Sequence, residues 1–374
     1  MCRQTILACI ITFACAAPAS ADDVPQGKPD LKSVGPLAFG PTGTLFIGDP
    51  KGAAIFVVEL DDAAGNPEEV ELNVKGIDEK IAAALGTTRD DILINDLAVN
   101  PATGAAYLSV SRGRGPDGDP VIVTVTGGDA AGKISELPLD DVKYVKFELA
   151  NAPEDKVAGE GRRRQNARLE SITDLAYLDG RLYVAGLSNE EFASKLRVID
   201  VPAESAEVGV SEADAGASVE IYHGSHGAYE TRSPVRTFTV VDVDEAPHLL
   251  AAYTCTPLVK IPVAMLRPGE KIRGETIAEL GNRNRPLDMI VYEKDGETFV
   301  LMANSARGLM KLPLAAAADA PAITEPVEDK AGVEYETIEG VEGVVQLDRL
   351  NSDHALVLVQ PEGGAADLKT MALP

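Results

Sequence analysis

The sequence predicts an all-β fold, a six-bladed β-propeller of four-stranded antiparallel blades, and two observations carry this prediction. A unit of two short apolar runs joined by a tight turn recurs six times between Val34 and Gln360. The units are spaced by about 50 to 75 residues, which is the length of one four-stranded sheet with its loops, and radial repetition of such sheets forms a propeller. The six turns lie at residues 41–43, 101–104, 178–180, 244–247, 294–296 and 351–353.

Residues 1–21 have the features of a secretory signal peptide. Arg3 precedes an apolar stretch from Ile6 to Ala17, and Ala19-Ser20-Ala21 forms a cleavage site of the small-x-small type. The stretch is too short to span a bilayer as a helix. We therefore expect export to the periplasm or secretion, with residues 22–374 forming a single propeller domain.

The cysteine content and the net charge of the chain limit the kinds of partner that it can bind and the role of its cysteines. Three of the four cysteines lie in the predicted leader, so only Cys255 remains in the mature chain, and we expect it to be buried because free cysteines usually are. The formal net charge of −25 makes nucleic acid or an anionic membrane surface an unsuitable partner. We expect a monomer.

The first blade is predicted from residues near the N-terminus of the mature chain. An inner strand at 34–40 and a second strand at 44–49 flank the first turn, a third strand follows at Ala53–Leu60, and a fourth at Val70–Val74 is expected to complete the sheet. Apolar residues three and four apart, with a trailing glycine, predict a short helix over 77–86.

The remaining blades repeat the same order of strands. The last blade lacks a fourth strand, so we expect the mature N-terminus to supply it and close the ring. Two longer stretches, 127–169 and 202–235, are expected to carry surface loops. The predicted first three strands are 94–99, 106–110 and 121–125 in blade two; 172–177, 181–186 and 196–201 in blade three; 237–243, 248–255 and 258–263 in blade four; 287–292, 298–303 and 308–312 in blade five; and 344–350, 354–359 and 367–373 in blade six.

The first blade also carries a family resemblance. The run Ala38-Phe39-Gly40-Pro41-Thr42-Gly43, followed by Leu45 and Asp49, resembles the blade signature of the NHL-repeat and gluconolactonase-like group of six-bladed propellers over about 30 residues. The resemblance implies the fold and, as an alternative function, hydrolysis of esters or lactones that depends on a metal such as Ca²⁺. Enzymes of this group bind their metal through a Glu directly before the Gly-Pro of the first inner strand, where this chain has Val34. One expected ligand is therefore missing.

Arginines gather on one predicted face of the propeller. Loops between blades share a face with loops between second and third strands, and these loops hold eleven of the seventeen arginines that follow residue 21. Guanidinium groups around a channel mouth would attract carboxylates, phosphates or sulfates. The sequence thus predicts binding of a small anionic ligand or an acidic region of a partner protein, unless the arginines pair with neighbouring acids. The proposed binding residues are Arg112, Arg114, Arg163, Arg232, Arg283, Arg285 and Arg307.

Three aspartates form a second pattern. Asp96, Asp174 and Asp288 each precede an apolar pair at the start of an inner strand, so they should lie near the channel. With Asn95 they could bind a hard cation such as Ca²⁺. Alternatively, each carboxylate accepts hydrogen bonds from loop backbone or a neighbouring arginine and fixes the packing of the blades.

Two histidines suggest a third possible site. His223 and His226 lie three residues apart in a glycine-rich loop and, with Cys255, could bind Cu or Zn. In the alternative hydrolase, either histidine would act as the base beside a metal bound by the aspartates. Whether the protein is an enzyme stays open at this stage, since no nucleophile elbow, phosphate loop or haem-attachment motif is present.

Overall fold

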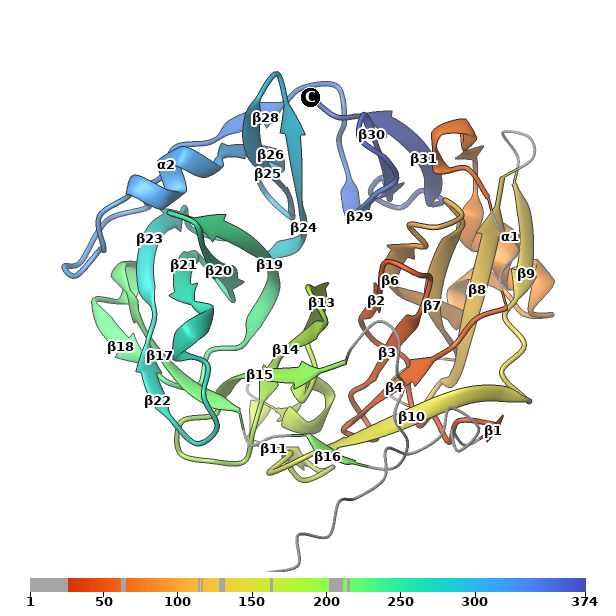
Figure 1. Cartoon of the computed structure of the whole chain (residues 1–374), viewed down its shortest axis with the longest axis horizontal. Coiled ribbons are helices and arrows are strands. Elements are labelled where there is room, and N and C mark those ends of the chain that lie inside the picture. The colour runs from red at the N-terminus through yellow and green to blue at the C-terminus, as the bar shows by residue number, and fades with distance from the viewer. Residues whose placement is uncertain are drawn as a thin grey trace, which may run out of the picture.

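The computed structural model describes residues 26–61, 65–113, 115, 117–127, 132–161, 164–201, 211–213 and 216–374. Six small antiparallel sheets surround a central channel (Figure 1), so the predicted six-bladed β-propeller is confirmed. The predicted signal peptide lies outside the described residues. Within the described chain, no helix is both long and apolar enough to cross a membrane.

Each blade begins with an antiparallel meander whose first two strands meet at one of the six predicted turns. The blades are numbered by the order of their first strands in the chain. Their strands, from the channel outward, are β2 (Leu37–Phe39), β3 (Leu45–Asp49), β4 (Ala54–Val58) and β10 (Val142–Leu149) in blade one; β6 (Ile92–Val99), β7 (Ala106–Arg112), β8 (Asp119–Thr126) and β9 (Lys133–Glu136) in blade two; β13 (Asp174–Leu178), β14 (Arg181–Leu187), β15 (Ser194–Asp200) and β17 (Ala217–His223) in blade three; β19 (Val235–Val243), β20 (Ala246–Tyr253), β21 (Pro257–Pro262) and β23 (Glu275–Leu280) in blade four; β24 (Pro286–Lys294), β25 (Glu297–Asn304), β26 (Gly308–Pro313) and β28 (Glu336–Ile338) in blade five; and β29 (Val344–Arg349), β30 (His354–Val359), β31 (Asp367–Ala372) and β5 (Asn73–Val74) in blade six.

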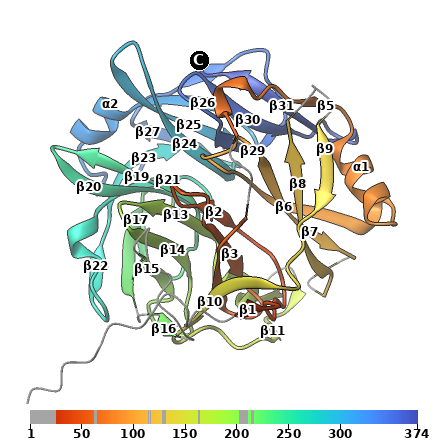
Figure 2. The ribbon, with the colours of Figure 1, turned by 45° about the vertical axis from the view of Figure 1, so that its right-hand side comes forward.

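Short strands and helices extend the blades at their outer edges. Figures 1 and 2 place the two helices outside the ring, so neither of them borders the channel. These outer elements are β1 (Gln26–Gly27) and β16 (Ser211–Ala213) on β10, β18 (Ala228–Glu230) and β22 (Lys271–Arg273) on β17, β27 (Lys330–Gly332) on β23, the hairpin of β11 (Val157–Ala158) and β12 (Gln165–Asn166), and the helices α1 (Ile77–Ala84) and α2 (Leu314–Asp319).

The blades do not follow one another around the ring in chain order. The inner strand β2 packs between β6 and β13, and β29 packs against β6. The order around the ring is therefore blade two, one, three, four, five, six and back to two. Blade two lies on the far side of blade one from blade three (Figure 1).

This order corrects the predicted fourth strand of blade one. The chain leaves blade one, builds blade two, and then returns through β10, which pairs with β4 in a register that places Phe147 opposite Ile55. The stretches at 127–169 and 202–235, predicted as surface loops, thus contain the outer strands of blades one, two and three. Outer strands are partly exposed, and their polar residues hid the alternation that marks the inner strands.

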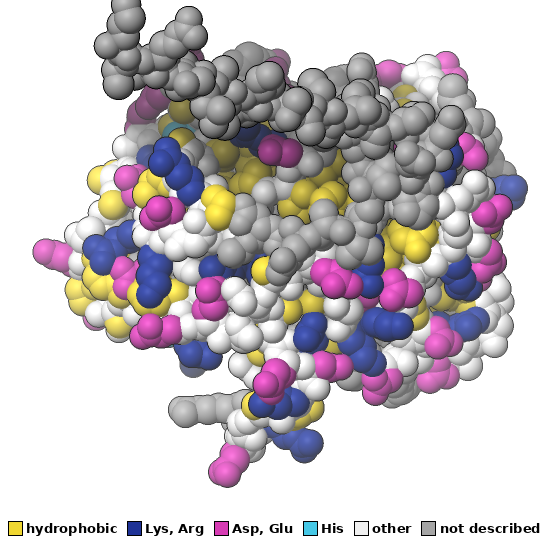
Figure 3. Space-filling model, turned by 60° about the horizontal axis from the view of Figure 1, so that its bottom comes forward, with side chains coloured by type: hydrophobic (Ala, Val, Ile, Leu, Met, Phe, Trp, Pro, Cys, Tyr) yellow, Lys and Arg dark blue, Asp and Glu magenta, His cyan; other side chains and the backbone are white. Residues whose placement is uncertain are grey.

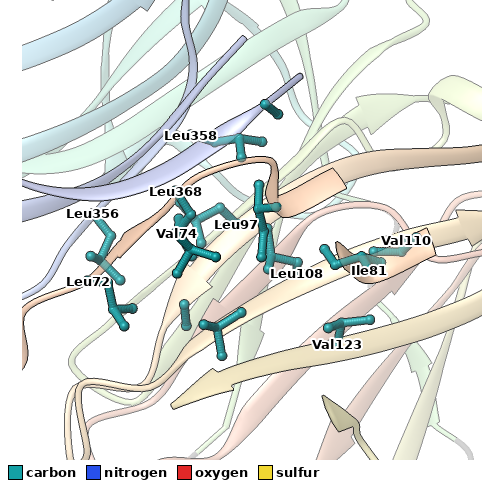
Figure 4. Close-up of a cluster of buried hydrophobic side chains, with 14 of the residues drawn as sticks. Leu72, Val74, Ile81, Leu97, Leu108, Val110, Val123, Leu356, Leu358 and Leu368 are labelled. Carbon is teal, nitrogen blue, oxygen red and sulfur yellow. The ribbon is translucent and has the colours of Figure 1, made fainter. Parts of the chain in front are cut away.

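The ring closes through β5 and not through the mature N-terminus. Asn73 and Val74 pair with Lys369 and Leu368 of β31, so a segment predicted for blade one completes blade six. The N-terminal strand β1 pairs instead with β10 at the edge of blade one. Figure 4 shows the apolar cluster around this closure, where Leu72 and Val74 lie beside residues of β30 and β31.

The predicted helix is present as α1. Its position follows from the pairing of β5 with β31, which closes the ring directly before the helix begins. Its buried residues Ile77 and Ile81 pack into the same cluster as Leu72 and Val74. The N–H of Ile77 donates to the carbonyl of Ala366 at 2.7 Å, which ties the start of the helix to blade six. The helix therefore covers the junction between blades two and six.

Candidate functional site

Four aspartates from four inner strands lie along the channel. Asp96, Asp174 and Asp288, predicted from the sequence, stand on β6, β13 and β24, and Asp348 of β29 joins them. Sequence reasoning missed Asp348 because Arg349 follows it, and not the apolar pair that follows the other three aspartates. The position directly after the register shift, which Asp96 and Asp288 occupy in their blades, is held by Gln346 in blade six.

Each carboxylate fastens its blade to the next one. One oxygen accepts a hydrogen bond from a backbone N–H on the inner strand of the neighbouring blade, and in three cases the other oxygen accepts the N–H of the following residue. The predicted alternative is observed in part, because the donors are backbone groups but lie in inner strands and not in loops. The bonds between blades run from Leu37 N to Asp96 Oδ2 at 2.7 Å, Phe238 N to Asp174 Oδ2 at 2.8 Å, Leu347 N to Asp288 Oδ2 at 2.8 Å, and Val99 N to Asp348 Oδ2 at 2.7 Å.

The four aspartates also line the central cavity, which has a volume of about 620 Å³. Residues with apolar side chains, including Phe39, Tyr177 and Phe238, outnumber the polar ones in its lining, but more polar than apolar surface faces the cavity. Among the described lining residues the charged side chains are the four aspartates, Glu68 and one cation, Arg349. The cavity is therefore strongly acidic and has the size of a small-molecule site.

Burial and mutual repulsion change the acidity of these carboxyl groups. Removal from water raises the pKa of Asp174 to about 7 and that of Asp348 to about 6, and the charge of Asp348 contributes to the shift at Asp174. The same burial, with repulsion by the other aspartates, raises the pKa of Asp96 and Asp288 well above the usual value for a carboxyl group. Carboxyl groups with perturbed acidity that face a cavity mark a candidate site.

The aspartates do not converge as a ready-made metal cage. Among the described histidine, cysteine and acidic side chains, only His223, His226 and Glu230 form a group of three whose ligand atoms lie within 4.8 Å of one another. The amide of Asn95 donates to the carbonyl of Val34 and to Ser111 Oγ, both at 2.9 Å. A Ca²⁺ site at the aspartates and Asn95 stays a prediction.

The predicted arginine site is described only in part. Arg114 and Arg163 lie outside the described residues. Arg112 and Arg307 pair with Asp119 and Asp329 at 3.2 and 3.7 Å.

The other three predicted arginines, Arg232, Arg283 and Arg285, are exposed. No described carboxylate lies within 4.0 Å of their guanidinium nitrogens. None of the described predicted arginines lines the cavity. On the side shown in Figure 3, basic and acidic side chains are interspersed.

The histidine pair lies at the outer edge of blade three. His223 ends β17 and His226 follows in the single turn η6 (Gly224–His226), with Glu230 of β18 as their nearest acidic partner. Cys255 was predicted to be buried, yet it is exposed, because it stands in the turn between β20 and β21 with φ of 79°.

The histidines are far from the aspartates. Since β17 is the fourth strand of its blade, three strand spacings, or roughly 14 Å, separate it from the inner strand. The alternative hydrolase needs a histidine base beside a metal at the aspartates. The structure does not bring these two groups together.

Comparisons with known proteins support no more than the architecture. No protein-family model matches the chain, and no curated protein sequence does. Similar solved structures include a putative oxidoreductase (glucose dehydrogenase) from Thermus thermophilus, with a TM-score of 0.34 and 12% identity over 93% of this chain and 99% of that one. A PQQ-bound aldose sugar dehydrogenase from Streptomyces coelicolor has a TM-score of 0.30 and 12% identity over 94% and 97%. Extracellular domains 1–2 of Drosophila semaphorin 1b have a TM-score of 0.39 and 10% identity over 94% and 87%. Likeness at this level says nothing about activity.

Proposed function

We propose that this propeller is a binding protein that holds a small organic cation, such as an amine, in its central cavity. One observation carries the proposal: four inner-strand aspartates face a cavity of about 620 Å³ whose described lining contains one cation, Arg349. A ligand with positive charge would compensate several carboxylates that share one cavity and are removed from water.

The hydrogen bonds between blades leave room for such a ligand. A carboxylate has about four lone-pair positions, and the backbone donors described above occupy two of them at Asp174, Asp288 and Asp348. The remaining positions can accept N–H groups of a ligand. Because these carboxylates are fixed by the backbone, little side-chain freedom would be lost on binding.

The arrangement of the lining favours an organic cation over a bare metal ion. Aromatic and aliphatic residues such as Phe39 and Tyr177 stand between the aspartates and can contact the carbon atoms of a ligand. The aspartates are also spread around the channel, and no three of them come within 4.8 Å as a group. A ligand of several atoms could reach more than one of them.

A thermal-shift screen at constant ionic strength tests the proposal. Putrescine, spermidine, tetramethylammonium and Ca²⁺ would be compared with phosphate, sulfate and citrate. We expect stabilisation by an organic cation that is lost in Asp288→Asn and retained in Asp295→Asn, whose side chain lies on an exposed turn away from the cavity. Equal shifts in both variants would mean that cations bind only the acidic surface.

Anion binding at the arginine face is a second candidate, favoured by the three exposed arginines that have no described carboxylate partner. Arg285→Gln should then abolish a shift caused by citrate or phosphate. Arg181→Gln should not, because Arg181 lies outside this face and is already paired with Asp200. If Ca²⁺ alone stabilised the protein and a lactone were hydrolysed, the gluconolactonase-like alternative would replace both candidates.

A further inference from the structure

A hairpin at the edge of blade three brings two histidines and a glutamate together. The register of β17 and β18 pairs His223 with Ala228 and Ile221 with Glu230. Residues two apart on a strand face the same side, so His223 and Glu230 are diagonal neighbours on one face. Gly227, with φ of 64°, ends the turn η6 and allows the tight reversal between His226 and β18.

The three side chains converge on one point. Glu230 Oε1 lies 2.9 Å from His223 Nδ1 and 2.6 Å from His226 Nδ1, and the two imidazole centroids are 3.8 Å apart. A carboxylate oxygen and two imidazole nitrogens thus face one another.

Residues of blade four contact the second ring nitrogen of the buried His223. His223 Nε2 lies 2.9 Å from Thr256 Oγ1 and 4.0 Å from Oε2 of Glu279, whose side chain is fully buried. Glu279 is itself fixed, since it accepts the N–H of Gly224 at 2.5 Å and the hydroxyl of Ser225 at 3.3 Å. Metal-binding histidines typically have a polar partner of this kind on the second ring nitrogen, which fixes the ring and the tautomer.

We propose that His223, His226 and Glu230 bind a transition metal ion, with Zn²⁺ as the best match, through both Nδ1 atoms and the carboxylate. Two histidines and a glutamate, with a fourth position left to water, form a known zinc ligand set. This site is distinct from the central cavity and goes beyond the proposed function.

The geometry needs only a small adjustment to admit the ion. Tetrahedral bonds of 2.0–2.1 Å to zinc separate neighbouring ligand atoms by about 3.3 Å, so the two contacts of Glu230 must widen by roughly half an ångström. His226 is 54% exposed in its side chain and can move, while His223 is held by Thr256. Metal enters from the solvent side and meets a preset buried ligand.

The third ligand differs from the one that the sequence suggested. Cys255 is next to Thr256 in the chain, yet its sulfur does not belong to the group of ligand atoms within 4.8 Å. The structure therefore assigns the third position to Glu230.

Metal titration of the whole chain, first stripped with a chelator, tests the site. Calorimetry with Zn²⁺ should give one equivalent per chain, and Co²⁺ should give the visible absorption bands of a tetrahedral site. His226→Ala should weaken zinc binding at least about 10-fold. Glu230→Gln, which keeps a hydrogen-bonding group but removes the charge, should do the same without a large change in melting temperature.

The chain offers matched controls. His248→Ala removes a histidine of blade four that lies outside the cluster, and Asp288→Asn alters the cavity instead, so both should bind zinc like the wild type. All variants keep the same four cysteines, so binding by thiols contributes equally to each. Absence of zinc binding in the wild type, or equal losses in His226→Ala and His248→Ala, would show that the cluster is a hydrogen-bond network only.

Discussion

At the scale of single residues, the channel aspartates combine a structural and a binding role. Each carboxylate accepts a backbone N–H from the next blade, which explains why an acceptor side chain is needed at this position of an inner strand. Removal from water makes the charged form unfavourable and raises the pKa of each group, and repulsion by other aspartates adds to the shift at Asp96, Asp174 and Asp288. The same arrangement that fastens the blades creates the uncompensated charge in the cavity.

The raised pKa of these groups predicts an unusual pH dependence of stability. A pKa of about 7 for Asp174 in the folded state exceeds the unfolded value of about 3.9, so the folded state binds more protons between these two pH values. This contribution to the free energy of unfolding is full below pH about 4 and is lost as the pH rises through about 7. Urea unfolding at pH 4.5 and 7.5 would measure it.

Asp174→Asn provides the comparison for this prediction. The variant should be less stable by about 1–3 kcal/mol at pH 4.5, because an amide cannot accept both backbone N–H bonds. It should also show a smaller fall in stability between the two pH values than the wild type. An unchanged difference between pH 4.5 and 7.5 would mean that Asp174 does not titrate in this range.

Candidate site residues could be found from the sequence only where the residues next to them in the chain indicated their place in the fold. The place of Asp96, Asp174 and Asp288 before apolar pairs predicted a position on the channel, and the spacing of His223 and His226 predicted a pair. Asp348 and Glu230 were missed because they are identified by the register of strands, which one sequence does not display.

At the scale of elements, the two-residue strand β5 is important for the stability of the propeller because it closes the ring. Leu72, directly before it, is 1% exposed and exchanges backbone and side-chain hydrogen bonds with Thr370 of β31. These contacts join a segment near the N-terminus to the last blade. Burial of apolar side chains supplies most of the free energy that stabilises this closure.

Leu72→Ala is therefore expected to destabilise the whole propeller by about 2–5 kcal/mol, as for other buried leucines. Leu93→Ala is the matched control, since Leu93 is 61% exposed and its loss should change stability by less than about 0.5 kcal/mol. Chemical unfolding of both variants measures the difference. Similar values for the two would indicate that β5 does not close the ring.

At the scale of the whole molecule, the sequence predicts the number of blades but not their order. Turn residues and apolar runs are local signals, and all six turns and inner strands were found from them. The return of the chain through β10 and the closure through β5 depend on pairing between segments far apart in the sequence. Such pairing depends on which apolar faces remain uncovered after the inner strands have formed. The β-strand propensity of single residues does not indicate which strands will pair.

Zero-length cross-linking tests the arrangement of the blades. Lys28 and Asp140 lie 2.7 Å apart and Lys146 and Asp30 lie 3.2 Å apart, so a carbodiimide should join the N-terminal segment to the region of β10. Mass spectrometry of the digested monomer would identify both links. A propeller with its blades in chain order would place β10 elsewhere and yield neither.

The central claim, that the cavity aspartates bind a small cation, is tested most directly by calorimetric titration of the protein with putrescine. One molecule should bind per chain at pH 7.5, about 10- to 100-fold more weakly in Asp288→Asn and unchanged in Asp295→Asn, because a charge-assisted hydrogen bond contributes about 1.5–3 kcal/mol. Binding should also weaken at pH 5.5, below the pKa of about 6 for Asp348 and about 7 for Asp174. Absence of binding at pH 7.5, or equal affinity in Asp288→Asn and the wild type, would contradict the claim and leave the aspartates as structural links between blades.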